Sequence, residues 1–165
     1  MSEPTAHASG PLITIGSLAV IALTTAWLPE RIATHFGANG VPNGFMTRGA
    51  YLAFMAAVAV GLPTLVLTAV AAATRRGSGS LNIPNRAYWF AAERRAATGD
   101  YLVRHLSRLS GGIAIFALAF HFLLIRANAQ VPPHLETLPF ALVLAAGLGA
   151  GTIWAATLRR RFRLP

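Results

Sequence analysis

Four long apolar stretches constrain the fold of this chain more than any other feature. They cover residues 12–28, 51–73, 109–127 and 138–158, and each approaches or passes the roughly 20 residues that a helix needs to cross a bilayer. Because 55% of the residues are hydrophobic and only 12% are charged, a soluble domain of this size could not bury the apolar surface. We therefore expect a single all-α domain over residues 1–165, an integral membrane four-helix bundle embedded in a lipid bilayer.

The distribution of arginine predicts the orientation of the four spans. All 14 basic residues are arginines. Eleven of them lie between the second and third stretches or after the fourth: Arg75, Arg76, Arg86, Arg94, Arg95, Arg104, Arg108, Arg159, Arg160, Arg161 and Arg163. Since basic residues are retained on the cytoplasmic side, we expect cytoplasmic N- and C-termini, a cytoplasmic segment at 74–108 and an outer loop at 29–49.

The net charge of +9 is explained by this topology, so we expect no nucleic-acid partner. The absence of lysine, together with abundant alanine and glycine, is typical of a GC-rich bacterial genome. We therefore expect a multi-pass protein of the bacterial cytoplasmic (inner) membrane.

The cytoplasmic segment is predicted to be helical. Asn85 can cap a helix over 86–98, Gly99 can end it, and Asp100 can cap a second helix that continues into the third span. Aromatic and guanidinium groups favour the headgroup layer. We therefore expect an interfacial helix whose Trp89, Arg94 and Arg95 side chains contact lipid.

Two features inside the spans bear on helix packing. Pro63 lacks an amide donor and should kink the second helix. Gly147 and Gly151 form a small-residue face on the fourth helix, which permits close approach of another helix. That neighbour is a helix of the same chain, a second copy in a homo-oligomer, or a subunit of a larger membrane complex.

The outer loop is rich in turn-forming residues. Asn39-Gly40 and Pro42-Asn43-Gly44 are both strong turn signals, and the aromatic residues Phe36 and Phe45 flank them. A flexible linker would not need these aromatic side chains. We expect a compact loop packed onto the outer ends of the helices, where a binding site can be built.

Two motifs in the chain resemble a known family. Residues 28–44 read Leu-Pro-x-x-Ile-x-x-His-Phe-x-x-x-Gly-x-Pro-Asn-Gly, directly after the first span. Residues 82–95 read Asn-Ile-Pro-Asn-Arg-x-Tyr-Trp-x-x-x-Glu-Arg-Arg. The chain thereby resembles the bacterial membrane domain of unknown function that opens the SdpI-type immunity proteins. That family commonly has aspartate after the loop proline, where this chain has Asn43, so a carboxylate is missing here.

Three histidines lie toward the outer side. His121 falls inside the third span, about 7 Å below its outer end, so it should face the bundle. His35 and His134 come from the two outer loops. If the three imidazoles converge, they could bind a transition metal such as zinc. They lack the spacing of a helical metal pair, so the favoured interpretation is that His35 hydrogen-bonds the loop backbone, that His121 hydrogen-bonds a neighbouring helix, and that His134 is exposed.

These observations favour a binding function over catalysis. Nucleophile elbows, phosphate-binding loops and intramembrane carboxylate pairs are all missing from the sequence. We expect the outer loop to recognise an extracytoplasmic peptide or a membrane-protein partner without a cofactor. The predicted binding residues are His35, Asn39, Gly40, Pro42 and Asn43, with His121 supporting them from below. The alternatives are a metal-dependent membrane enzyme or metal carrier using the histidines, and an accessory subunit of a larger complex.

Overall fold

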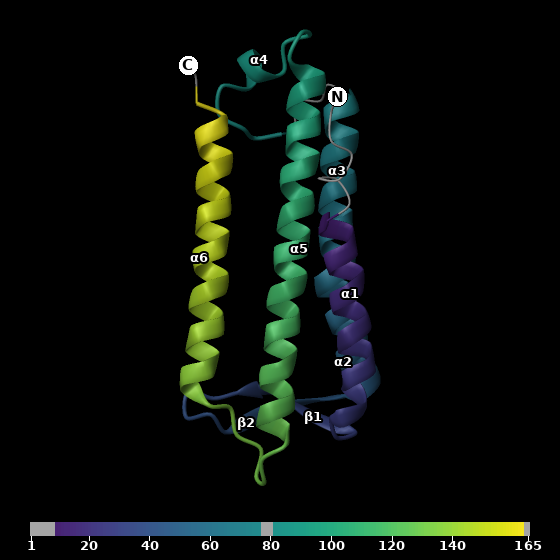
Figure 1. The fold of residues 1–165 in the computed structure, drawn as a ribbon, viewed down its shortest axis with the longest axis vertical. Coiled ribbons are helices and arrows are strands. Elements are labelled where there is room, and N and C mark those ends of the chain that lie inside the picture. The colour runs from purple at the N-terminus through teal and green to yellow at the C-terminus, as the bar shows by residue number, and fades with distance from the viewer. Residues whose placement is uncertain (1–8, 77–80, 164–165) are drawn as a thin grey trace.

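The computed structural model describes residues 9–76 and 81–163, and it contains four helices long and apolar enough to cross a membrane (Figure 1). The predicted four-span, all-α architecture is confirmed. In chain order the elements are α1 (Ser9–Thr24), the 3-10 turn η2 (Thr25–Trp27), β1 (Arg31–Phe36), β2 (Pro42–Thr47), α2 (Arg48–Ala56), the π-helical segment η3 (Ala57–Gly61), α3 (Leu62–Arg76), α4 (Arg86–Trp89), α5 (Arg95–Asn128) and α6 (Thr137–Arg161).

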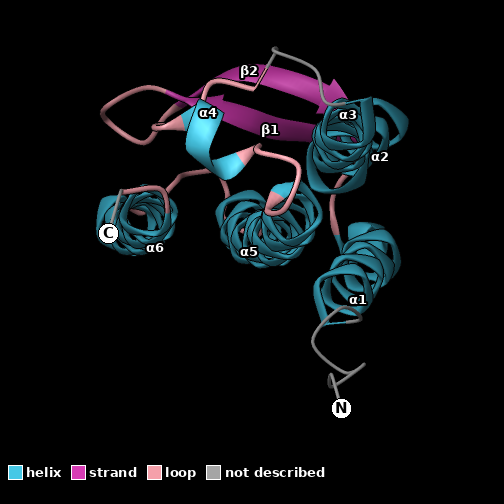
Figure 2. Ribbon diagram, turned by 90° about the horizontal axis from the view of Figure 1, so that it is seen from above, coloured by secondary structure: helices cyan, strands magenta, loops and turns pink. Residues whose placement is uncertain are grey.

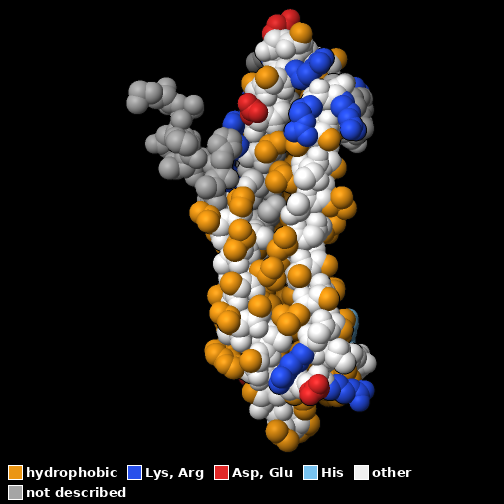
Figure 3. Space-filling model, turned by 90° about the vertical axis from the view of Figure 1, so that its right-hand side faces the viewer, with side chains coloured by type: hydrophobic (Ala, Val, Ile, Leu, Met, Phe, Trp, Pro, Cys, Tyr) orange, Lys and Arg blue, Asp and Glu red, His pale blue; other side chains and the backbone are white. Residues whose placement is uncertain are grey.

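The two ends of the bundle differ in structure and charge. One end carries β1 and β2 and is called the hairpin end below; the other carries α4 and the last turn of α6 and is called the arginine end (Figure 1). Hydrophobic side chains cover the middle of the molecule, while arginines gather toward the ends (Figure 3). This is the surface pattern expected of helices that face hydrocarbon between two polar layers.

The second span is one continuous helix with an irregular centre. α2, η3 and α3 follow each other without a break, and the Leu62 amide donates to the Ala57 carbonyl, five residues back. Pro63 comes directly after this π turn and has no amide to donate. The structure thus has a wider turn on the N-terminal side of Pro63, and the predicted kink of the second helix stays a prediction.

The segment at 29–49, predicted as an outer loop, folds as a β-hairpin, which the sequence did not lead us to expect. β1 and β2 pair antiparallel, with His35 opposite Gly44 and Phe36 opposite Pro42, and the register shifts at these positions. The predicted turn at Asn39-Gly40 is confirmed, but the predicted turn at Pro42-Asn43-Gly44 is wrong, because these residues belong to β2. Pairing with β1 holds this segment extended, and the bulge accommodates Asn43 as an extra residue.

The segment between α3 and α5 also differs from the expected two helices. α4 is a single turn, and α5 starts at Arg95 and passes through Gly99 and Asp100 without a break. Gly99 does not end a helix; a Cβ atom there would lie 3.3 Å from Thr74 Cβ, so its small size lets α5 approach α3. Asn85 makes no capping bond but donates from Nδ2 to the Phe162 carbonyl at 3.0 Å.

The main core is built by three spans and the hairpin, without α6. Its buried side chains are Ile21, Leu28, Ile32, Tyr51, Met55, Ala59, Ala117 and Leu124. None of the residues of α6 is buried. The fourth span instead joins α5 through smaller clusters at the two ends of the bundle, around Leu135 and around Phe162.

Candidate functional site

The hairpin is attached to the bundle by Asn128, the last residue of α5. Its Oδ1 accepts from the Ala33 amide at 2.8 Å, and its Nδ2 donates to the Ala33 carbonyl at 3.0 Å and to the Leu124 carbonyl at 2.9 Å. The Asn128 side chain thus hydrogen-bonds both the amide and the carbonyl of Ala33, on the edge of β1 that does not pair with β2. Figure 2 shows β1 between β2 and α5, so this attachment leaves β2 on the outside.

The hairpin turn rests on the second loop at the same end. Gly40 has φ of 75°, and its carbonyl accepts from the Leu135 amide at 2.9 Å. A Cβ atom at Gly40 would lie 2.6 Å from both the His134 ring and the Leu135 carbonyl oxygen. Only glycine can adopt this left-handed backbone conformation and also lie this close to His134 and Leu135. Asn39 supports the turn through its Oδ1, which accepts from the Val41 amide at 3.2 Å.

A pocket of about 310 Å³ lies between the hairpin, α5 and the start of α6. Its apolar lining includes Phe36, Phe120, Leu135 and Phe140, and its polar side chains are Thr34, His35 and Thr137. The Thr34 hydroxyl and His35 Nδ1 are 3.2 Å apart. This volume is within the range of small-molecule sites, and an apolar wall with a few polar groups is their usual composition.

The five predicted binding residues in the hairpin divide into two groups. His35 and Gly40 line the pocket. Asn39, Pro42 and Asn43 lie in the same hairpin but are not among the lining residues, and Asn39 and Asn43 are exposed. Only part of the predicted segment therefore contributes side chains to the concave surface, and binding there stays a prediction.

His121 lies beneath the hairpin and joins three helices. It is fully buried, as predicted, with Nε2 2.8 Å from Thr24 Oγ1 and Nδ1 2.7 Å from the Tyr51 hydroxyl. The Thr24 hydroxyl already donates to the Val20 carbonyl, so it accepts from Nε2–H. In a neutral ring Nδ1 then accepts from Tyr51. The ring has both partners within the protein, which is what an imidazole buried among membrane helices requires.

The three histidines do not form a metal centre. His35 is exposed in β1, His121 is enclosed by its two hydroxyl partners, and His134 packs on Gly40. Within residues 9–76 and 81–163, no group of three His, Cys, Asp or Glu side chains is placed to hold a metal ion. The alternative of a metal-dependent enzyme or metal carrier required the three imidazoles to converge. They do not converge in the described part of the chain.

Trp89 is inside the protein, which corrects its predicted place at the lipid interface. Only 9% of the residue is exposed, and its Nε1 donates to the Phe162 carbonyl at 3.2 Å. The Arg161 guanidinium lies 4.3 Å from the centre of its ring. The motif around Trp89 therefore docks onto the end of α6. Arg94 is half-buried and Arg95 is exposed, so contact with lipid stays a prediction for these two arginines.

Two structural contacts had no signal in the sequence. Asn128 ends a helix and carries no local pattern that reveals Ala33 as its partner. His105 stacks on Trp154 with ring centres 4.8 Å apart, and the Trp154 indole donates to the His105 carbonyl at 3.0 Å. Both contacts join segments far apart in the chain. Within one sequence, nothing marks such pairs.

Comparison with known proteins addresses the N-terminal part of the chain. No curated protein and no solved structure matches the chain significantly. Residues 12–60 match the family model described as Domain of unknown function (DUF1648). The match spans the first helix, the hairpin and the start of the second span, and it confirms for this region the predicted resemblance to a membrane domain of unknown function.

Proposed function

We propose that this is an SdpI-like protein of the bacterial inner membrane that binds an extracytoplasmic peptide, or an exposed segment of a membrane-protein partner, at the hairpin end. The observation that carries the proposal is the pocket of about 310 Å³ beside His35 and Gly40. It is held open by two rigid attachments, the Asn128 clamp on β1 and the Gly40–Leu135 hydrogen bond. A preorganised pocket loses little entropy when a ligand enters.

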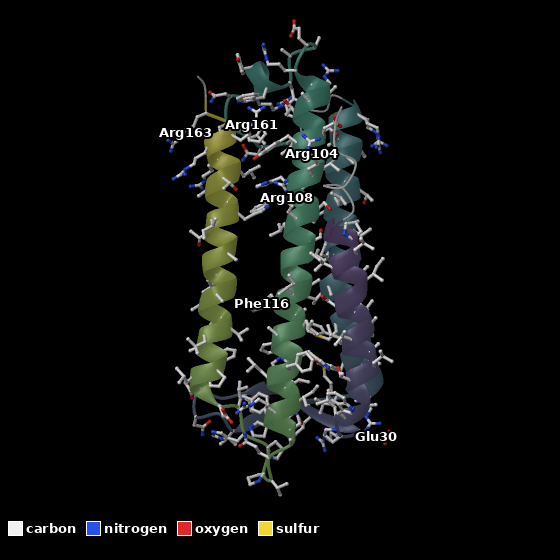
Figure 4. The ribbon with its side chains drawn as sticks, in the orientation of Figure 1. Glu30, Arg104, Arg108, Phe116, Arg161 and Arg163 are labelled. Atoms are coloured by element: carbon white, nitrogen blue, oxygen red, sulfur yellow. The ribbon has the colours of Figure 1, made fainter. Side chains whose placement is uncertain are left out.

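The charge distribution supports a hairpin end that faces outward. The arginine end carries Arg104, Arg108, Arg161 and Arg163 (Figure 4), whereas an exposed Arg126–Glu136 pair lies beside the second loop of the hairpin end. Retention of arginine in the cytoplasm would place the arginine end inside and the pocket outside.

The chemistry of the pocket defines the class of ligand. Three phenylalanines and a leucine provide the large apolar side chains of the lining, so the bound group is an apolar or aromatic side chain of the ligand. His35 and Thr34 can orient its polar neighbours. β2 forms the outer edge of the hairpin (Figure 2), and a free strand edge can add main-chain hydrogen bonds to an extended peptide.

Selection of displayed peptides on the full chain in nanodiscs tests the binding proposal. We expect enrichment of extended peptides with one aromatic anchor, and at least about tenfold weaker binding to the Thr137→Trp variant, whose larger side chain fills the pocket. The matched control is Val41→Ala, which is exposed beside the turn and does not line the pocket. Equal binding to both variants, or no enrichment, would remove the proposal.

Thiol labelling tests the orientation separately. The chain contains no cysteine, so a single introduced thiol reports one position. An impermeant reagent applied to intact cells should label Asn39→Cys at the hairpin turn and leave Arg95→Cys unlabelled. The reverse pattern would place the pocket in the cytoplasm.

A further inference from the structure

A second concave surface lies between α5 and α6, toward the arginine end. It has a volume of about 430 Å³ and is lined mainly by apolar side chains and glycines; the lining includes Leu109, Ile113, Phe116, Leu148 and Trp154. This surface, called the α5–α6 groove below, is separate from the pocket at the hairpin end. The groove forms because side chains of α5 and α6 contact each other at the two ends of the groove and leave space between these contacts.

Side-chain contacts close the groove at both ends. Toward the middle of the bundle the Phe116 ring lies against Gly147, where a Cβ atom would be 2.6 Å from the ring. Toward the arginine end, Trp154 stacks on His105. Between these contacts, Gly112 and Gly151 have nothing within 4 Å of an added Cβ atom. At these two glycines the groove is therefore open down to the backbone, which leaves space for a chain of methylenes.

Arg108 places a charge at the end of this apolar groove. It lines the groove, and Figure 4 shows its side chain extending from α5 toward α6, as Phe116 does farther along the helix. No hydrogen bond or ion pair occupies its guanidinium among the described residues. Along α5 the nearest acid is Asp100, eight residues or about 12 Å away along the axis. A guanidinium without a counter-ion beside hydrocarbon attracts a phosphate.

We propose that the α5–α6 groove holds one acyl chain of an anionic phospholipid from the leaflet at the arginine end, with the lipid phosphate on Arg108. The chain would lie along Gly112 and Gly151 and end against Phe116. Any lipid-facing groove is filled by some hydrocarbon; the specific claim is selection of an anionic headgroup by Arg108. This proposal does not depend on the ligand at the hairpin end.

The size of the groove favours a lipid chain over another helix. From Arg108 to Phe116 the groove extends about 12 Å along α5, and a helix about 10 Å wide would fill about 900 Å³ over that length. The available volume is about 430 Å³, roughly half of that. A second copy, or a partner helix, could cover the groove but could not enter it.

Quenching of Trp154 by brominated lipid tests the proposal on the full chain in liposomes. The protein is placed in phosphatidylcholine that contains a minor fraction of brominated phosphatidylglycerol or, for comparison, brominated phosphatidylcholine. The contribution of Trp154 is obtained by subtracting the signal of the Trp154→Phe variant. We expect about fivefold preference for phosphatidylglycerol, the factor that corresponds to about 1 kcal/mol for one arginine near an anionic lipid.

Three variants separate the headgroup contribution from the groove contribution. Arg108→Gln should remove the preference and leave the groove intact. Gly151→Leu should reduce quenching by both lipids because its side chain fills the groove, whereas Gly149→Leu, two residues away with equally open space and outside the lining, should behave as the original chain. Equal quenching by the two brominated lipids would overturn the proposal. A dimer that Gly151→Leu dissociates and Gly149→Leu does not would assign the groove to a second copy instead.

Discussion

Replacing Asn128 with alanine tests how much of the attachment of the hairpin depends on a single side chain. The substitution removes two hydrogen bonds to Ala33, at 2.8 and 3.0 Å. Each contributes about 0.5–1.5 kcal/mol, so the docked hairpin should lose about 1–3 kcal/mol relative to an undocked one. That corresponds to about 5- to 150-fold more frequent opening.

Amide hydrogen exchange in nanodiscs measures this opening. The informative amide is that of Leu135, which donates to the Gly40 carbonyl and not to Asn128. If the whole hairpin undocks from the bundle at once, hydrogen exchange at the Leu135 amide should accelerate together with exchange at the Ala33 amide. Asn39→Ala, which removes only the local bond to Val41, should leave the Leu135 amide protected. Faster exchange at Ala33 alone would refute the reasoning, because the hairpin would then be held by other contacts.

Three further predictions address other contacts. His121→Ala should lower the free energy of unfolding by roughly 1–3 kcal/mol, because the buried Tyr51 hydroxyl loses its partner; an SDS titration of the purified protein measures this, and an unchanged midpoint would contradict it. Gly40→Ala should disrupt the hairpin turn, since an added Cβ meets the second loop, whereas Gly49→Ala has open space; exchange of the loop amides distinguishes them. Arg126→Ala removes an ion pair whose arginine side chain is 66% exposed, so stability should change by less than about 1 kcal/mol in the same titration.

The spans and the burial of His121 could be predicted because lipid imposes a simple rule on each residue. Apolar length alone identifies a crossing, and an imidazole within a span must find a partner in the protein. Neither inference requires knowing which helices are neighbours. The partners of His121, Thr24 and Tyr51, could not be named in advance for the same reason.

The hairpin and the location of Trp89 depend on contacts between distant segments. Pro42-Asn43-Gly44 carries strong turn residues, yet pairing with β1 holds it extended, since tertiary contacts override local preference. Trp89 among arginines is typical of a lipid interface, but the end of α6 offers its indole a carbonyl acceptor at Phe162. In both cases the deciding partner is remote in the chain.

The absence of α6 from the main core has a consequence for biosynthesis. The buried side chains of that core come from the first three spans and the hairpin, all of which precede α6 in the chain. The contacts around Tyr51 and Leu124 can therefore form before the last helix packs. The fourth helix then adds to a finished surface on α5, with Phe116 already in position to receive Gly147.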